Sequence, residues 1–427
     1  MSSDAQLRTF VSLVRGTTYK GELVGHPGPV LLGLASIKPD GGFRTGSFKT
    51  YGGDSPAKIT LGPGDIYVSL KDVTQSGDLL GSVARVPSDI AAGRLTQDTV
   101  KLAFDGQPIG KDYVYWLLRT PAYRTYCRAH ATGTTTLGLA RDDFLDFPIP
   151  APGIKELSLV ELLQGLEERI TLLHETNATL EAIAQALFKS WFVDFDPVRA
   201  KQQGLAPAGM DEATAALFPD SFEESALGLV PKGWQVGILG DIARTAKNQV
   251  QPSELHSAIN YVGLEHIPRK SLSLVNWETA DGLESAKARF SEGDVLFGKL
   301  RPYFHKVIVA PFDGVCSTDI LVCQAKQPAY YGVVVMHLFS TAFIDYADRL
   351  SNGAKMPRIG WRDIAAYPVV VPTEHIAALY TEAIAPVLGR MKANVFQAQT
   401  LAILRDTLLP RLISGQLRLP EAEALAA

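Results

Sequence analysis

The chain has 427 residues, of which 46% are hydrophobic and 20% are charged, a balance typical of a globular protein that buries substantial cores. Its net charge of −4 argues against a protein that coats nucleic acid indiscriminately, because such binding depends on neutralising phosphates. No apolar run approaches the ~20 residues that cross a bilayer, the first residues do not resemble a secretory signal, and the three cysteines lack CxxC spacing. These features predict a cytoplasmic protein without a disulfide framework or a zinc ribbon.

Residues 1–152 are predicted to form the first domain. Short apolar runs such as 29–34, 64–68 and 99–102 are separated by turn-forming residues, which is typical of strands in a mixed α/β domain. The proline-rich stretch 148–152 ends this pattern.

Residues 153–200 are predicted to form a long helix. Apolar residues recur there at alternating spacings of three and four, with one asparagine among them. A stripe of this kind in a short helix usually packs on the helix's own domain, but an unbroken helix over 154–191 would be ~55 Å long, which exceeds the width of a small domain. The stripe consists of Leu163, Leu166, Ile170, Leu173, Asn177, Leu180, Ala184, Leu187 and Trp191.

The rest of the chain is predicted to divide into a linker over 201–231, a second domain over 232–372, a second long helix over 373–415 and a tail over 416–427. The second long helix carries the same heptad spacing as the first. Its stripe consists of Val387, Met391, Asn394, Ala398, Leu401, Arg405, Leu408 and Leu412.

The two heptad stripes are expected to bury one another. Because one long helix follows each domain, we predict an α+β protein in which an antiparallel coiled coil holds two similar domains at opposite ends of a stiff spacer. Asn177 and Asn394 would then fix the register of the helices rather than perform chemistry.

The two predicted domains repeat one another. Residues 133–152 recur as 353–372, at an offset of 353 − 133 = 220 positions and without a gap. Residues 61–68 match 290–297 at an offset of 290 − 61 = 229, because the intervening loops differ in length. A period this long indicates a domain duplication rather than a solenoid of short units. Two similar domains on one chain suit a target with two similar halves.

No complete catalytic or cofactor-binding motif is present. Residues 293–299 fit the first seven positions of a phosphate-binding P-loop, but Leu300 replaces the Ser or Thr that would reach magnesium, and 295–297 form a strand pattern. Residues 194–197 superficially resemble the Asp-Pro-Pro-aromatic motif of adenine methyltransferases, without its second proline or its aromatic residue. The eight histidines are scattered singly, and neither GxGxxG nor HExxH occurs. We therefore predict no catalytic residue, metal site or cofactor in this chain.

Basic and aromatic residues gather at the repeated loops, where they are candidates for binding phosphates or guanine edges. A charged, solvated rim explains any single one of them about equally well. The candidates in the second copy are Lys299, Arg301, Lys355 and Arg358, with Tyr303, His305 and Lys306 close by in the sequence, and those in the first copy are Lys71, Thr134, Thr135 and Arg141. Different residues at equivalent positions imply that the two domains read different sequences.

Four stretches of the chain resemble the specificity subunits of Type I restriction-modification systems. Residues 188–198, Phe-Lys-Ser-Trp-Phe-Val-Asp-Phe-Asp-Pro-Val, resemble the central conserved region of that family, and 404–415 resemble its second helical region. The stretches 293–297 and 353–372 resemble its target recognition domains.

This resemblance implies a noncatalytic subunit that recognises an asymmetric, two-part site in double-stranded DNA. The helices would set the gap between the half-sites and would bind two methyltransferase subunits. The residues expected at those partner contacts are Phe188, Trp191, Phe192, Leu408 and Leu409. S-adenosylmethionine would be bound by the methyltransferase subunits, and ATP and Mg by two restriction subunits.

Two other classes of protein remain open on the sequence alone. One is a two-lobed coiled-coil scaffold that binds protein or carbohydrate, which the acidic balance mildly favours. The other is an enzyme whose active site follows no recognised motif. The glycine loops and the basic and aromatic clusters favour DNA recognition over both.

Overall fold

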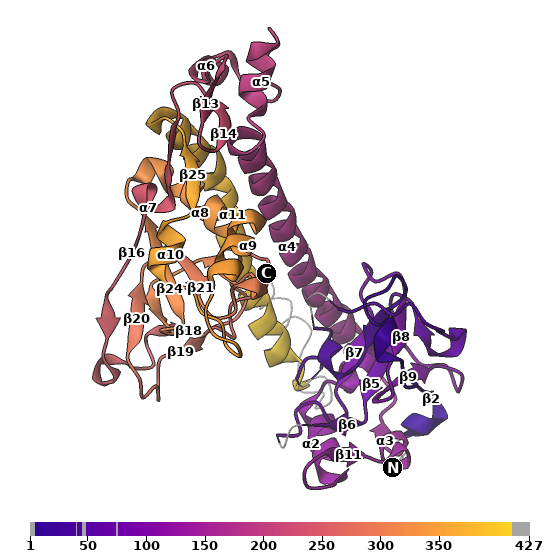
Figure 1. Ribbon diagram of the computed structural model, residues 1–427. Coiled ribbons are helices and arrows are strands. Elements are labelled where there is room, and N and C mark those ends of the chain that lie inside the picture. The colour runs from indigo at the N-terminus through magenta and orange to yellow at the C-terminus, as the bar shows by residue number, and fades with distance from the viewer. Residues whose placement is uncertain (1–4, 40, 45–47, 74–75, 412–427) are drawn as a thin grey trace. The chain divides into compact units, whose positions relative to one another are not determined.

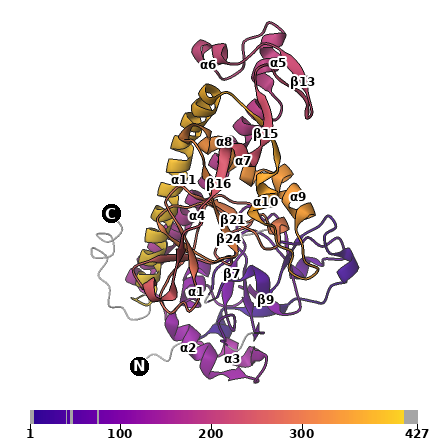
Figure 2. The same ribbon diagram turned by 60° about the vertical axis from the view of Figure 1, so that its left-hand side comes forward.

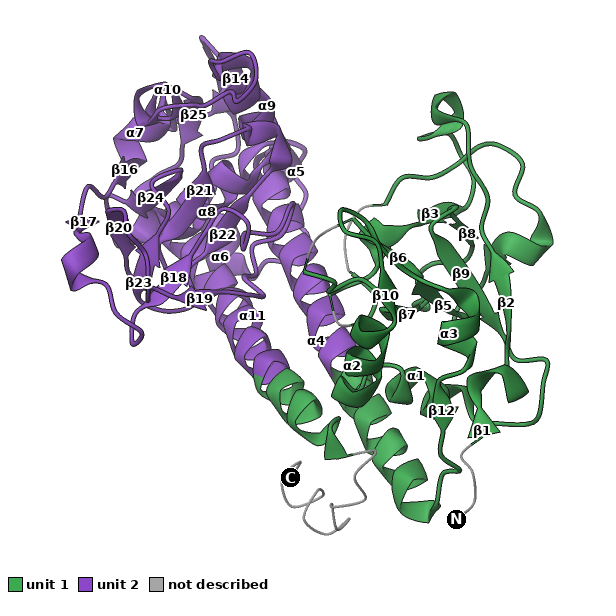
Figure 3. Ribbon diagram, turned by 90° about the horizontal axis from the view of Figure 1, so that it is seen from below, with its two compact units in different colours: residues 1–169, 400–427 green, residues 170–399 purple. Residues whose placement is uncertain are grey.

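The computed structural model describes residues 5–39, 41–44, 48–73 and 76–411, and the chain forms two compact units (Figure 3). Unit 1 comprises Met1–Arg169 and Thr400–Ala427, and unit 2 comprises Ile170–Gln399. The predicted tail over 416–427, and residues 412–415 of the predicted second helix, lie outside the described residues.

The predicted α+β class is confirmed, as are the two long helices. Helix α4 spans Ile154–Phe192 without interruption, and α11 spans Glu374–Leu408 (Figures 1 and 2). Helix α11 ends two residues before Pro410, a residue that cannot donate the backbone hydrogen bond of a continuing helix. No helix among the described residues is long and apolar enough to cross a membrane.

Unit 1 is built on a four-stranded antiparallel sheet of order β2-β9-β5-β7. Its central strand, β5, is buried along its whole length, in agreement with its apolar sequence. The four strands are β2 (Ser12–Arg15), β9 (Thr99–Ala103), β5 (Ile66–Ser69) and β7 (Val83–Arg85). Three smaller sheets complete the unit. The first pairs β1 (Ala5–Gln6) with β12 (Pro148–Ile149), and the second has β8 (Gly93–Leu95) between β3 (Val30–Leu32) and β4 (Thr60–Leu61). The third has β11 (Leu137–Leu139) between β10 (Ala131–Thr132) and β6 (Lys71–Asp72).

Three short helices contribute to the core of unit 1. They are α1 (Lys111–Leu117), α2 (Pro121–Ala129) and α3 (Arg141–Leu145). Trp116, Tyr123 and Phe144 from these helices are fully buried in a core that also contains Leu163 of α4 and Leu408 of α11. The ends of the long helices that belong to unit 1 are therefore part of its core.

Unit 2 repeats the main sheet of unit 1, with the order β16-β24-β21-β22. These strands are β16 (Ala243–Thr245), β24 (Ile320–Ala325), β21 (Val295–Gly298) and β22 (Val307–Val309). The helices around it are α7 (Leu239–Ile242), α8 (Tyr331–Phe339), α9 (Thr341–Leu350) and α10 (Trp361–Ala365). A five-stranded sheet contains β17 (Gln249–Val250), β20 (Lys287–Phe290), β23 (Gly314–Cys316), β18 (Asn260–Val262) and β19 (Glu278–Thr279), and β15 (Gln235–Ile238) pairs with β25 (Pro368–Val371).

The turn before the central strand is the same in both units. Gly64 and Gly293 have φ angles of +82° and +85°, a conformation that favours glycine. Asp65 Oδ2 accepts a hydrogen bond from Gly62 N at 3.0 Å, and Asp294 Oδ2 accepts one from Ser291 N at 2.8 Å. The segment that partly fits a P-loop is thus a turn followed by a strand, as its sequence pattern predicts.

Polar contacts inside unit 2 show that α4 and α11 pair antiparallel, as predicted. Asn394 Nδ2 donates to Asn177 Oδ1 at 2.8 Å, and Asn177 Nδ2 donates to the carbonyl of Met391 at 3.0 Å. Farther along α4, the carbonyl of Ala184 accepts from the hydroxyl of Tyr380 at 3.0 Å. Both asparagines are buried, so a shift in register would leave the donors and acceptors of these hydrogen bonds without their partners.

The segment predicted as a linker is structured. It begins with the last two residues of α5 (Asp196–Gln202) and contains α6 (Glu212–Leu217) and a hairpin of β13 (Phe222–Ser225) and β14 (Gly228–Pro231). Phe218 and Val230 are buried, and Phe218 packs edge-on against Trp191 with ring centroids 5.1 Å apart. A few apolar residues in a Gly- and Ala-rich sequence are enough to fasten this segment to unit 2.

Candidate nucleic-acid interface

Unit 2 brings together the four residues predicted from its sequence to bind DNA. The backbone N–H of Arg301 donates to the carbonyl of Pro357 at 2.7 Å, and Ile359 N–H donates to the carbonyl of Lys299 at 3.1 Å. Leu300 also forms an isolated antiparallel bridge with Arg358. The segment that follows β21 and the glycine loop before α10 are therefore hydrogen-bonded neighbours, although they are far apart in the sequence.

Arg301 holds the glycine loop in place. Its Nη2 donates to the carbonyl of Lys355 at 3.2 Å, and its guanidinium lies 5.8 Å from the centroid of the Phe304 ring. Its backbone has a φ angle of +51°, a conformation that is uncommon for residues other than glycine. Part of the donor capacity of this arginine is thus used inside the protein, while the side chain of Lys355 is exposed.

Arg358 is held by a carboxylate that the sequence analysis did not identify. Its Nε lies 3.2 Å from Asp319 Oδ1, and 51% of its side chain remains exposed. Asp319 comes directly before β24, far from Arg358 in the sequence, so only the pairing of the two segments reveals the contact.

The candidates of unit 1 lie on its three-stranded sheet and directly after it. Lys71 on β6 is opposite Gly138 on β11, while Thr134 and Thr135 are exposed in the turn that joins β10 to β11. Arg141 is exposed at the first residue of α3. Lys71 Nζ lies 3.2 Å from Asp98 Oδ1, and 48% of its side chain is exposed. Asp98 is 27 residues from Lys71 in the sequence, so here too only the folded structure reveals the contact.

In unit 2, the aromatic and basic residues near Lys299, Arg301, Lys355 and Arg358 divide into exposed residues and residues engaged within the protein. Tyr303 is 48% exposed, and the guanidinium of Arg269 lies 3.9 Å from the centroid of the Phe304 ring. His305 is buried, with its Nε2 2.9 Å from the carbonyl of Phe339, and Lys306 is half-buried, with its Nζ donating to the carbonyl of Leu264. Burial lowers the pKa of both side chains. Arg269 and Tyr303 are exposed and accessible to a ligand, whereas His305 and Lys306 are engaged within the protein.

Comparison with known proteins finds similarity to Type I specificity subunits. No family model matches the chain. It is 26% identical over 62% of its length to the Type I restriction enzyme EcoDI specificity subunit of Escherichia coli, and 24% identical over 73% of its length to the MjaIX specificity subunit of Methanocaldococcus jannaschii. The HindI specificity subunit of Haemophilus influenzae is 23% identical to it over 61% of this chain. The predicted resemblance to Type I specificity subunits is confirmed.

The matches to these specificity subunits are partial. This chain spans 60% of the E. coli protein, 70% of the M. jannaschii protein and 66% of the H. influenzae protein. A crystal structure of the S subunit of a Type I restriction-modification system from M. genitalium has the same fold, with a TM-score of 0.50 and 14% sequence identity over 96% of this chain and 95% of that one.

The residues predicted to contact partner subunits are buried within the chain. Phe188, Trp191 and Phe192 pack in the core of unit 2, where Phe192 meets the Tyr380 ring edge-on at 5.0 Å. Leu408 and Leu409 lie in the core of unit 1. Partner binding by these five side chains stays a prediction, and in the isolated chain they offer little surface to another subunit because their exposed fractions are at most 7%.

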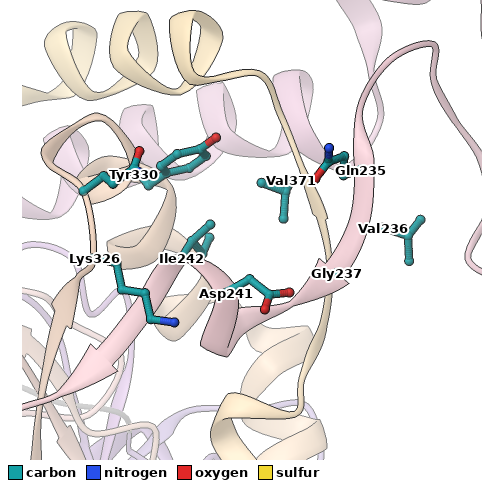
Figure 4. A pocket seen from close by; sticks show the side chains of 9 residues that line it. Gln235, Val236, Gly237, Asp241, Ile242, Lys326, Tyr330 and Val371 are labelled. Atoms are coloured by element: carbon teal, nitrogen blue, oxygen red, sulfur yellow. The ribbon is translucent and has the colours of Figure 1, made fainter.

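A polar pocket of about 220 Å³ lies elsewhere in unit 2 (Figure 4). Two of its polar side chains are engaged locally: Asp241 Oδ2 accepts from the N–H of Ile238 at 2.8 Å, and the Tyr330 hydroxyl donates to the carbonyl of Pro372 at 3.1 Å. None of the predicted DNA-binding residues lines it, and among the described residues no group of three or more His, Cys, Asp or Glu could hold a metal ion. The basic surfaces are therefore better candidates for the functional site than this pocket.

Proposed function

We propose that this chain is the noncatalytic DNA-recognition subunit of a Type I restriction-modification complex. The observation that carries the proposal is the duplicated fold: two units present partly exposed cations at related positions, but the cations differ in kind and come from different segments of the repeat. A repeated scaffold with different reading residues suits a target made of two different half-sites. The similarity to Type I specificity subunits supports the same conclusion.

The proposal assigns distinct roles to the parts of the chain. Each unit reads one half-site of an asymmetric, gapped sequence in double-stranded DNA. Helices α4 and α11 set the gap, because both run through the two units and are locked in one register by Asn177 and Asn394.

Partner subunits would carry out the methylation and restriction reactions. Two methyltransferase subunits would bring S-adenosylmethionine and flip the target adenine out of the duplex, since a base must leave the stack before its exocyclic amine can be modified. Two restriction subunits would bring ATP and Mg. Exposed apolar side chains on the long helices, Leu172, Ile183 and Ile403, are more accessible to such partners than the buried aromatic residues near the end of α4.

The test is selection of DNA by the assembled complex. The chain is produced together with a methyltransferase subunit of a Type I system from the same host, and the purified complex selects from a pool of randomised duplexes. We expect enrichment of two short sequences at a fixed distance. Enrichment of no sequence, together with specific binding to a protein or a carbohydrate, would favour the alternative of a two-lobed coiled-coil scaffold, which the relatives do not support.

A further inference from the structure

Asp98 of unit 1 and Asp319 of unit 2 occupy equivalent positions of the duplicated fold. Strand β5 pairs with β9 so that Val68 is opposite Val100, and β21 pairs with β24 so that Phe297 is opposite Leu321. Each aspartate lies two residues before the second member of its pair. Strands β5 and β9, and strands β21 and β24, lie side by side in Figure 1.

The turns that carry the two aspartates also match. In unit 1 the N–H of Thr99 donates to the carbonyl of Thr96 at 3.2 Å, and in unit 2 the N–H of Ile320 donates to the carbonyl of Ser317 at 2.9 Å. In both units the aspartate is the residue before the donor of this turn. The backbone around the two carboxylates therefore has the same hydrogen bond.

Each aspartate pairs with one cation, and the two ion pairs are alike. The distance is 3.2 Å from Asp98 to Lys71 Nζ and 3.2 Å from Asp319 to Arg358 Nε. The cations are 48% and 51% exposed, and the carboxylates 27% and 30%. Both sites thus have a partly buried carboxylate beneath a half-exposed cation.

In both units a backbone bridge joins two segments next to the aspartate, but the cation lies on one segment in unit 1 and on the other segment in unit 2. In unit 1 Lys71 is opposite Gly138, and in unit 2 Leu300 is opposite Arg358. Lys71 and Leu300 are equivalent at the offset of 229, and Gly138 and Arg358 are equivalent at the offset of 220. The position of the charge is therefore kept while the residue that supplies it changes, which two unrelated surface ion pairs would not be expected to do.

We propose that Asp98 and Asp319 are positioning residues that aim Lys71 and Arg358 at the bases of the two half-sites. Asp319 engages only Nε of Arg358, and among the described residues the two terminal nitrogens of that guanidinium have no hydrogen-bond partner. Those nitrogens suit the two acceptors on the major-groove edge of guanine. Lys71 is a compact charge with three rotatable donors, whereas the guanidinium of Arg358 is a rigid planar fork. The two units therefore present different donor geometries to their half-sites at this position.

This inference rests on the proposed function, and its test uses the full chain assembled with its methyltransferase subunit. The complex selects from randomised duplexes as wild type and as Asp319→Ala, Asp98→Ala and Arg358→Ala variants. Glu292→Ala is the matched control, because Glu292 is an exposed carboxylate of unit 2 that pairs with Lys392 away from the glycine loop. Asp319→Asn keeps an oxygen that can accept from Nε and is the conservative variant.

The expected result is a position-specific loss. Arg358→Ala should reduce the preference at one base pair of one half-site by about 5- to 150-fold. Asp319→Ala should relax the same base pair by a smaller factor, should add little to Arg358→Ala, and should be partly rescued by Asp319→Asn. Asp98→Ala should change only the other half-site, and Glu292→Ala should change neither.

Several outcomes would overturn the inference. One is a wild-type two-part preference that Asp319→Ala and Asp98→Ala leave unchanged, which would refute the positioning role and leave the proposed function intact. Another is a uniform weakening of both half-sites by Asp319→Ala and Asp319→Asn with a lowered Tm, which would show a purely structural role. A wild-type complex that selects no two-part sequence would refute the proposed function and this inference together.

Discussion

At the scale of single residues, the buried amide pair of unit 2 shows how polar groups specify a structure. Asn394 has an exposed fraction of 1%, and its Nδ2 is the donor to Asn177 Oδ1. Asn394→Ala should lower the free energy of unfolding by about 1–3 kcal/mol, because Asn177 Oδ1 would be left buried without that hydrogen bond. Chemical denaturation measures the change. Arg390→Ala, at an exposed position of the same helix, is the control, and equal stability of the two variants would contradict the expectation.

Glu181 of α4 makes the stability of unit 2 depend on pH. It is 7% exposed, its Oε2 accepts from the N–H of Leu272 at 2.6 Å, and burial raises the pKa of its carboxyl from 4.5 to about 7. The folded state therefore holds this proton more tightly than the unfolded state does. Stability contributed by the protonated form is present below pH 4.5 and decreases as the pH rises to about 7.

Glu181→Gln removes this titration. Relative to wild type, the variant should gain stability between pH 5 and pH 8, by up to about 3 kcal/mol, because it carries no charge to bury. Denaturation curves of both proteins at the two pH values measure the difference, and the comparison cancels the titration of all other groups. An identical pH dependence in the two proteins would show that this carboxyl is solvated in the folded state.

Single residues also show which parts of the site are predictable from sequence. Arg358 and Lys71 are identifiable because a basic residue that follows a repeated glycine loop or a repeated strand has a chemical meaning without any structure. Asp319 and Asp98 are not, because an aspartate before a strand is unremarkable until pairing brings it to its cation. The contact of Lys306 Nζ with the carbonyl of Leu264 depends on packing in the same way.

At the scale of elements, the long helices are the most predictable part of the fold. Their heptad spacing recurs over many turns, so the hydrophobic stripe decides the structure without help from distant residues. The segment 201–231 is the opposite case. Its composition predicts a linker, but α6 and the β13–β14 hairpin form there because Phe218 and Val230 find a core supplied by other elements.

The paired helices should act as a ruler. Inserting one heptad between Leu166 and Ile170 of α4, and a matching heptad between Leu401 and Arg405 of α11, should lengthen the helices by about 10 Å, which corresponds to about three base pairs. These two stretches are neighbours in unit 1, where Arg405 pairs with Glu167. Selection from randomised duplexes should return the original half-sites with a wider gap.

A heptad inserted into α4 alone is the control for the ruler experiment. It leaves Asn177 beside Asn394 in unit 2 but shifts Glu167 by seven residues relative to Arg405 in unit 1, so the variant should lose stability rather than acquire a new gap. An unchanged gap in a folded complex that carries both insertions would show that the helices do not set the spacing.

At the scale of the whole molecule, the duplication is the feature from which the function follows. The order of the main sheet, the turn before its central strand and the carboxylate beside it occur in both units, while the residues that carry charge differ. A scaffold that is constant and a surface that varies are what recognition of two different sequences requires.

The purified chain should have no methyltransferase, nuclease or ATPase activity of its own. This expectation follows from the incomplete P-loop pattern at Lys299 and Leu300 and from the absence of a complete cofactor motif in the sequence. Turnover assays with S-adenosylmethionine and with ATP measure it. Turnover by the chain alone that disappears in Gly298→Ala or Asp196→Ala variants would contradict it.

The most direct test of the central claim is a map of adenine methylation in the host genome, with this gene present and with it deleted. The account predicts one asymmetric motif of two short sequences separated by a fixed gap, methylated when the gene is present and unmethylated when it is deleted. Methylation that is identical in the two strains, or a lost motif that is continuous rather than gapped, would contradict it.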